Sequence, residues 1–194
     1  MQDTTVKRIA ITGTISSGKS QVAKILTELG FKHVSLSDMI RKVVKDKHLP
    51  ETRATLIDTG NWMRKRDGIG ILARMVSDQM GGDTETNLVV ETIRNPAEAD
   101  ILKDRLGCEL WCVDAPLELR FQRLVARNRD GDAVTKEEFM KINERDLGKD
   151  EPVNGQQVGK CIQMADVVII NDGSEEELRA KVMEALQRRQ DKHK

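Results

Sequence analysis

The sequence predicts an α/β fold of three layers, in which helices flank a five-stranded parallel sheet. Short apolar stretches of strand type alternate along the chain with segments of helical period. The stretches are apolar without interruption, as in Val167-Val168-Ile169-Ile170, which is typical of strands buried on both faces. A chain of 194 residues is long enough for one domain with its own core, and we expect residues 1–194 to form one.

The expected elements follow from this alternation. The strands are expected at Val6–Thr12, His33–Ser35, Leu88–Val90, Leu110–Val113 and Val167–Ile170. The helices are expected at Ser20–Leu29, Ser37–Lys47, Ile69–Met80, Pro96–Leu106, Leu117–Arg127 and Glu175–Arg188. Two polar, charged stretches, at about 49–68 and about 128–160, fit the alternation poorly. Such insertions in a compact domain are usually lids or binding arms.

Composition excludes several function classes. Lys+Arg and Asp+Glu both number 32, so no overall field draws the chain to nucleic acid or to a membrane surface. Aromatic residues make up 3% of the chain, which argues against a base-stacking platform. The three cysteines lack the spacing of a disulfide framework or a zinc site. No apolar run is long enough for a signal peptide or a membrane span, so a cytoplasmic protein without a membrane partner is expected.

Residues 13–20 carry the strongest motif. They read Gly-Thr-Ile-Ser-Ser-Gly-Lys-Ser and match G-x-x-x-x-G-K-[ST], between an expected strand and an expected helix. Glycines let backbone N–H groups approach phosphate oxygens, Lys19 supplies a cation for the β- and γ-phosphates, and Ser20 offers a hydroxyl to Mg²⁺. The motif therefore predicts a P-loop NTPase fold that binds ATP and Mg²⁺. The residues expected to hold the nucleotide are Gly13, Ser16, Ser17, Gly18, Lys19, Ser20 and Gln21.

Polar residues follow the second strand, in the run Ser37-Asp38-Met39-Ile40-Arg41. Ligands of doubly wound sheets bind beyond the carboxyl ends of the strands, so Asp38 and Arg41 are expected to face the site. The alternative is that Ser37 or Asp38 only caps the next helix.

The chain resembles the nucleoside monophosphate kinase group. Adenylate kinases carry a similar small-polar-Asp-Met-Leu-Arg run, whose arginine binds the acceptor phosphate, and dephospho-CoA kinases carry an Asp after the same strand. A more extensive resemblance, over most of the chain, is to small archaeal and bacterial P-loop kinases. It rests on residues 37–41, Val89-Val90-Glu91-Thr92-Ile93-Arg94-Asn95-Pro96, Val113-Asp114-Ala115-Pro116, Glu144-Arg145-Asp146 and Asn171-Asp172-Gly173.

One departure from that family lies after the third strand. The relatives usually read Asp-Gly-Ile-Arg there, whereas this chain reads Glu91-Thr92-Ile93-Arg94. Glu91 keeps a carboxylate for Mg²⁺ coordination through water, with Asp114 as the alternative. Thr92 puts a side chain where the relatives have glycine, so the acceptor specificity of this chain could differ from theirs. Arg94 is expected to bind an acceptor phosphate through two nitrogens, and a solvated arginine at a helix start is the alternative.

The resemblance also implies a short lid at about 127–150. Arg120, Arg123 and Arg127 share one face of the expected helix, while Leu117, Phe121, Leu124 and Val125 fall on the other. In the resembled kinases such arginines close over ATP and stabilise the transferring phosphoryl group. The expected catalytic residues are Lys19, Asp38, Arg123 and Arg127, with Arg145 as a further candidate and Arg120 as a possible packing residue. Asn171 and Gly173 are expected beside the adenine ring, or else in an ordinary turn.

The stretch from Arg41 to Arg66 completes the expected acceptor-binding arm, which is helical and spans about 37–68. It carries eight basic and three acidic residues, a net charge of +5 within a neutral chain. Either this is a solvated helix face, or the arm uses Arg41 and Arg64 to hold an anionic acceptor.

The sequence thus predicts an ATP- and Mg²⁺-dependent phosphotransferase with a nucleotide-type acceptor: a nucleoside or deoxynucleoside monophosphate, or dephospho-CoA. One alternative is a kinase that phosphorylates a hydroxyl of a modified nucleotide within DNA or RNA, which neutral charge and few aromatics disfavour. The other is a regulatory ATPase that is not a kinase. A hydroxyl acceptor would use Asp38 as a base, whereas a phosphate acceptor needs none.

Overall fold

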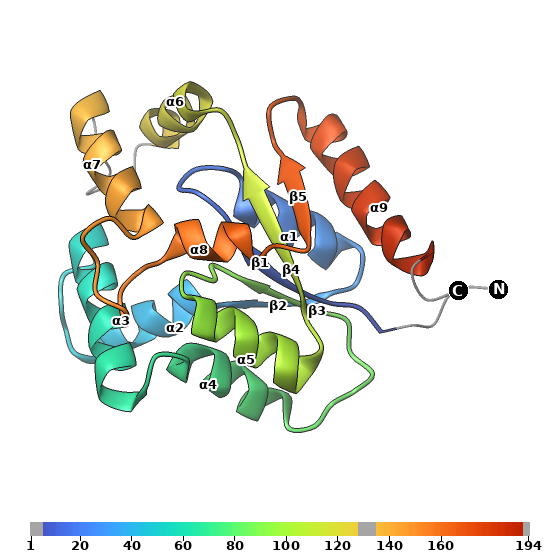
Figure 1. The fold of residues 1–194 in the computed structure, drawn as a ribbon, viewed down its shortest axis with the longest axis horizontal. Coiled ribbons are helices and arrows are strands. Elements are labelled where there is room, and N and C mark those ends of the chain that lie inside the picture. Colours follow the sequence, from blue (N-terminus) through green and yellow to red (C-terminus); the bar gives the residue numbers. More distant parts are fainter. Residues whose placement is uncertain (1–5, 128–134, 192–194) are drawn as a thin grey trace.

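The structure, a computed structural model, describes residues 6–127 and 135–191 (Figure 1). Five parallel strands form one sheet in the order β2-β3-β1-β4-β5. They are β1 (Arg8–Thr12), β2 (Lys32–Ser35), β3 (Leu88–Glu91), β4 (Glu109–Asp114) and β5 (Val167–Ile170). The predicted α/β fold with a five-stranded parallel sheet is confirmed.

Helices surround the sheet. They are α1 (Lys19–Glu28), α2 (Leu36–Asp46), α3 (Arg53–Asp67), α4 (Ile71–Met80), α5 (Pro96–Leu106), α6 (Leu117–Arg127), α7 (Lys136–Leu147), α8 (Val158–Gln163) and α9 (Glu175–Asp191). Among them, α3 lies in the predicted helical arm, although the sequence predicts no separate helix at 53–67, α7 lies in the second poorly fitting stretch, and α8 begins in it. Thr52 caps α3 by accepting from Thr55 N, and Thr135 and Glu138 form a capping box at the start of α7.

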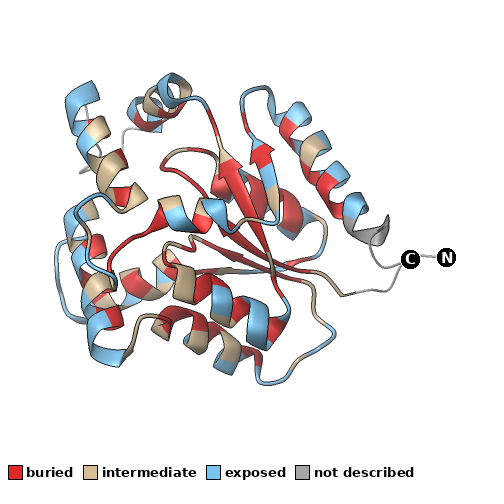
Figure 2. Ribbon diagram, viewed as in Figure 1, coloured by how far each residue is buried: buried red, intermediate tan, exposed pale blue. Residues whose placement is uncertain are grey.

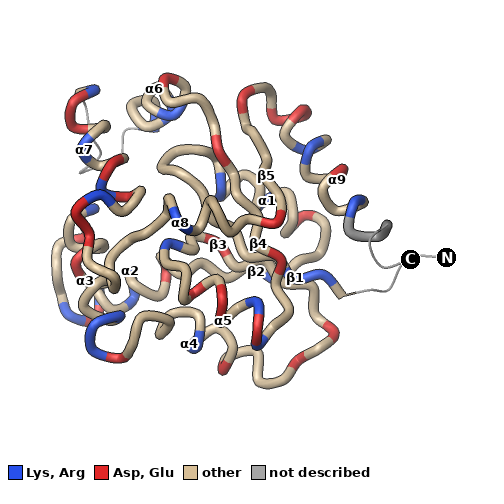
Figure 3. Tube along the Cα trace, viewed as in Figure 1, with Lys and Arg blue, Asp and Glu red and all other residues tan. Residues whose placement is uncertain are grey.

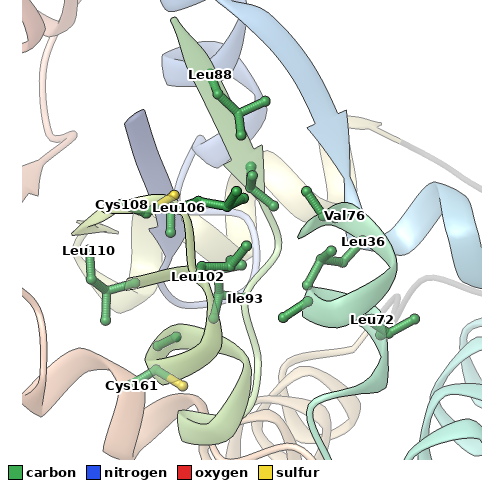
Figure 4. Packing of buried hydrophobic residues seen from close by; sticks show 14 of the residues in the cluster. Leu36, Leu72, Val76, Leu88, Ile93, Leu102, Leu106, Cys108, Leu110 and Cys161 are labelled. Atoms are coloured by element: carbon green, nitrogen blue, oxygen red, sulfur yellow. The ribbon is translucent and has the colours of Figure 1, made fainter. Parts of the chain in front are cut away.

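Two apolar clusters cover the two faces of the sheet. On one face, α1 and α9 pack against the strands through residues such as Leu26, Trp111 and Val182. On the other face, α2, α4 and α5 contribute Leu36, Leu72 and other residues shown in Figure 4 to a second cluster. The central strands are buried along their length, as Figure 2 shows, which explains their uninterrupted apolar sequences. The expectation that Val167–Ile170 is buried on both faces is wrong, because β5 is an edge strand that exposes Val168 and Ile170.

The strand order creates a crevice at the sheet's carboxyl edge. The chain passes from β1 to the β2–β3 side and then returns to β4 on the opposite side of β1. Ligands of open α/β sheets bind where the order reverses in this way, here beyond the end of β1. Within residues 6–127 and 135–191, none of the helices is both long and apolar enough to span a membrane.

Candidate functional site

The loop between β1 and α1 turns tightly beside the neighbouring strands. Gly13, Ser16 and Gly18 have positive φ angles of 137°, 58° and 98°. A Cβ on Gly13 would lie 1.9 Å from the carbonyl oxygen of Val113, and one on Gly18 would lie 2.1 Å from Asn171 Nδ2. Both positions therefore require glycine, because the loop backbone approaches β4 and the chain after β5 more closely than a side chain allows.

Lys19, the first residue of α1, is buried inside this loop. Its Nζ donates hydrogen bonds to the carbonyl oxygens of Gly13 (2.8 Å) and Thr14 (2.7 Å). Burial, with a smaller contribution from the nearby Arg94, lowers the pKa of Lys19 from 10.5 to about 8, although Asp146 acts in the opposite direction. The ammonium is thus mostly protonated at neutral pH, and its hydrogen bonds within the described residues go to neutral carbonyl groups.

A carboxylate at the end of β3 faces the start of α1. Glu91 is buried, and its Oε1 lies 3.3 Å from His33 Nε2 on β2. Burial raises the pKa of Glu91, but the hydrogen bond and charge of His33 and the Ser20 hydroxyl outweigh it, so that this pKa lies below its ordinary value. The same contact raises the pKa of His33. Glu91 is therefore ionised at neutral pH.

The oxygens near Glu91 fit a magnesium ion that keeps several waters. Glu91 Oε2 is buried without a hydrogen-bond partner among the described residues, and the exposed Ser20 lines the same cavity. Asp114 Oδ1 accepts instead from Thr14 Oγ1 (2.5 Å) and from a backbone amide. Over the described part of the chain, no three His, Cys, Asp or Glu side chains gather as a metal site. Such sparse protein ligation suits Mg²⁺, which binds through one or two oxygens plus waters and phosphates.

Asn171 connects the chain after β5 to the phosphate loop. Its Nδ2 donates to the carbonyl oxygen of Ser17 (2.9 Å) and to Gln21 Oε1 (3.3 Å), and Arg123 donates to its carbonyl oxygen (3.0 Å). The Asn171 side chain is therefore buried against the loop, while Gly173 is exposed two residues further on. Sequence reasoning placed both beside the adenine ring and did not foresee this support of the loop.

Helix α6 differs from its predicted division into two faces. Arg120 is buried, where its Nη1 donates to Asn143 Oδ1 of α7 (2.7 Å), and its Nε donates to a backbone carbonyl. Leu117 and Val125, expected on the packed face, are exposed. Arg120 thus joins α6 to α7 as a packing residue, one of the two roles considered for it. Residues 128–134 of the predicted lid lie outside the described residues.

A cavity of about 880 Å³ extends from the phosphate loop to α2 and α3. It brings most of the predicted site residues together, from both the donor and the acceptor side. Gly13, Ser17, Asn171 and Gly173 do not line it. The predicted residues that do are Ser16, Gly18, Lys19, Ser20, Gln21, Asp38, Arg41, Arg64, Glu91, Arg94, Arg123 and Arg127.

Carboxylates accompany the arginines of the acceptor end. Arg41 Nη1 lies 2.9 Å from Asp38 Oδ1, and Arg41 Nε lies 3.0 Å from Glu51 Oε1. Arg64 Nε lies 2.8 Å from Glu98 Oε1 in a fully buried pair. Figure 3 shows basic and acidic segments close together around α3. Two of the eight basic residues of this stretch, Arg41 and Arg64, are thus paired with the carboxylates of Asp38 and Glu98, which lie outside it.

Arg94 is held by Asp146 of α7 and by Gln156, which precedes α8. Its Nη1 pairs with Asp146 of α7 and also donates to Gln156 Oε1 (3.3 Å). Asp146 is buried, and its Oδ2 has no hydrogen-bond partner among the described residues. Sequence reasoning missed Gln156 and Arg53, which also line the cavity. The sequence could have indicated Arg53, because it is a basic residue within a basic stretch. No local sequence pattern predicts that Gln156 lines the cavity.

The chain is similar to known proteins over most of its length. Residues 9–141 match the family model described as an AAA domain. Over 186 residues the chain is 33% identical to a UPF0200 protein of Saccharolobus solfataricus. The alignment covers 95% of this chain and 94% of that relative. The chain belongs to the UPF0200 family.

Solved structures share its fold. TT1252 from Thermus thermophilus has a TM-score of 0.64 at 22% identity and covers 95% of this chain and 97% of its own. The shikimate kinase from Acinetobacter baumannii in complex with shikimate has a TM-score of 0.60 at 20% identity and covers 96% of both chains. The UPF0200 chain therefore has the fold of the small P-loop kinases, as its sequence predicts.

Proposed function

We propose that the protein is an ATP-dependent phosphotransferase that moves the γ-phosphate of ATP to a nucleotide-type acceptor. The observation that carries this proposal is the cavity of about 880 Å³, which has the phosphate loop at one end and α2 and α3 at the other. Its volume is in the range of pockets that enclose small molecules. Phosphoryl transfer depends on positioning two reactants and stabilising charge, and a cavity with two polar ends serves both needs.

The donor end would hold ATP through the loop backbone and Lys19. The amides after Gly13 would face the phosphates, and the Lys19 ammonium would turn from its two carbonyl partners to the β- and γ-phosphates. Ser20 and Glu91 would hold Mg²⁺, which would offset part of the negative charge of the phosphates. The buried Glu91 oxygen without a described partner supports this assignment.

Arginines would stabilise the charge of the transferring group. Arg123 and Arg127 lie one helical turn apart on α6, and both line the cavity. Arg123 is anchored to the carbonyl oxygen of Asn171, so it stands close to the phosphate loop. Arginines in these positions would stabilise the charge that develops in the transition state, and no solvent would have to reorganise. Such preorganised electrostatic stabilisation is usually the largest single contribution to catalysis.

The acceptor end combines cations with an apolar wall. Arg41, Arg64 and Arg94 line it, and Ile40 and Leu56 are among the apolar residues beside them. A ring can lie against an aliphatic wall while its phosphate competes with the resident carboxylates for an arginine. This chemistry fits a nucleoside monophosphate, and dephospho-CoA shares it.

Transfer of labelled γ-phosphate to a panel of acceptors tests the proposal. The panel contains nucleoside monophosphates, dephospho-CoA and DNA with hydroxymethylated bases. A labelled acceptor supports the proposal, whereas slow ATP hydrolysis that no acceptor stimulates would favour the regulatory ATPase.

The variant Asp38→Asn then identifies the acceptor chemistry. A hydroxyl acceptor predicts a loss of kcat of about 10²-fold to 10⁴-fold, because a general base is removed. A phosphate acceptor predicts unchanged turnover. Asp46→Asn, an exposed carboxylate on the same helix, is the matched control.

A further inference from the structure

A β-branched residue with a left-handed backbone stands at the edge of the cavity. Thr92 follows β3 directly, has a φ of 67° and lines the cavity. A threonine rarely adopts this conformation, because its Cβ crowds the backbone, and such a residue persists only where its surroundings hold it. The hydrogen bonds of the Thr92 hydroxyl show which groups stabilise this backbone conformation.

The hydroxyl of Thr92 uses its whole hydrogen-bonding capacity. Oγ1 donates to the carbonyl oxygen of Glu91 (2.6 Å). It accepts from the backbone amide of Ser37 (3.1 Å) and from Ser37 Oγ (3.2 Å). A hydroxyl has one donor and two acceptor positions, so all three are occupied.

These bonds replace a missing helix cap. Ser35, the N-cap residue of α2, makes no side-chain capping bond. The amides of a helix's first turn have no partner within the helix, and a side-chain oxygen at the N-cap normally accepts from one of them. Here Thr92 supplies that oxygen from the end of another strand, to Ser37 N.

We propose that Thr92 is a positioning residue, which caps α2 from β3 and thereby fixes Asp38 and Arg41 at the acceptor end of the cavity. Asp38 directly follows Ser37, and Arg41, one turn further on, is bonded to Asp38 at 2.9 Å. The same hydroxyl is bonded to the backbone of Glu91, so one side chain links the two ends of the cavity. The effect on the acceptor rests on the proposed function, but the capping of α2 does not.

Three substitutions separate the hydroxyl from the backbone conformation. Thr92→Val keeps the shape and removes the hydroxyl, Thr92→Ser keeps the hydroxyl, and Thr92→Gly suits the positive φ but lacks the oxygen. Hydrogen–deuterium exchange of the amides at residues 36–40 is expected to accelerate by about twofold to tenfold in the valine and glycine variants, as for loss of a cap, and to stay unchanged in the serine variant. Thr135→Val, which removes the cap of α7, is the control and leaves α2 unchanged.

Steady-state kinetics with AMP as the acceptor probe follow. In Thr92→Val, kcat/KM for AMP is expected to fall about tenfold to a hundredfold while KM for ATP stays within about twofold, because only the acceptor end is displaced. Thr92→Ser is expected to retain both values. Unchanged exchange of α2 in Thr92→Val, or an equal loss in Thr92→Ser, would overturn the proposal. If the wild-type protein phosphorylates none of the acceptors above, the proposed function fails, and the exchange experiment still decides the role of Thr92.

Discussion

Nucleotide binding is expected to be coupled to proton uptake by Lys19. In the free protein, burial lowers the pKa of Lys19 from 10.5 to about 8. The neutral fraction is then about one-tenth at pH 7, about half at pH 8 and about nine-tenths at pH 9. Phosphate oxygens beside the amine favour its charged form and raise this pKa again. Each nucleotide bound should therefore take up about 0.1, 0.5 and 0.9 protons at these three pH values.

Titration calorimetry measures this uptake directly. A non-hydrolysable ATP analogue with Mg²⁺ is titrated at pH 7, 8 and 9, each in two buffers of different ionisation enthalpy. The association constant is expected to fall about twofold from pH 7 to pH 8 and about fivefold from pH 8 to pH 9, because binding increasingly requires a proton from solution. The stability of the free protein depends on pH in the opposite direction from nucleotide binding. The unfolded chain binds this proton more tightly than the folded protein, so the contribution of Lys19 to the free energy of unfolding rises between pH 8 and pH 10.5.

Two variants complete this experiment. Lys19→Arg carries a charge that does not titrate in this range, so its binding should show no such pH dependence. Lys24→Arg, an exposed position one turn further along α1, should keep the wild-type profile. Equal pH dependence in Lys19→Arg and in the wild type, or its absence from both, would refute the assignment of the proton to Lys19.

Other substitutions test the site and its support. Gly18→Ala would place a Cβ 2.1 Å from Asn171 Nδ2 at a φ of 98°. We therefore expect at least about tenfold weaker binding of the ATP analogue and a free energy of unfolding that is lower by about 1–3 kcal/mol in thermal denaturation. Glu98→Gln leaves the buried Arg64 guanidinium without its carboxylate and should lower the free energy of unfolding in urea by about 3–5 kcal/mol; a change under about 1 kcal/mol would contradict a buried ion pair. Arg94→Gln should raise KM for the acceptor by about tenfold or more without changing KM for ATP. Equal increases in both KM values would contradict the assignment of Arg94 to the acceptor phosphate.

Local patterns explain why much of the fold could be predicted from the sequence. The phosphate loop is encoded by eight consecutive residues, and the buried strands by short apolar runs. Helix α5 begins at Pro96 after an Asn95 cap and ends before Gly107, and its predicted bounds are those observed. Helix α3 was not separated from the rest of the predicted helical arm, and α7 was missed, because polar residues hide their apolar period. Helix α8 was missed because its six residues are too few to show a period.

The arrangement of the site depends on contacts that no local pattern contains. The Asn171 side chain reaches Ser17, 154 residues away in the chain, and the Arg64–Glu98 pair spans 34 residues. A count of charges along 41–66 therefore suggested a cationic arm, although Arg41 and Arg64 are paired with Asp38 and Glu98 from outside the stretch. The left-handed conformation of Thr92 likewise follows from a tertiary bond to α2 rather than from its own preference.

Acceptor-dependent transfer of labelled γ-phosphate tests the central claim most directly. The wild-type protein with ATP and Mg²⁺ is predicted to label a nucleotide acceptor, and Lys19→Met is predicted to abolish the labelling. Lys24→Met, which alters an exposed lysine of the same helix, is predicted to retain it. Hydrolysis of ATP at the same slow rate with and without every acceptor would contradict the account, since the cavity would then hold only one substrate.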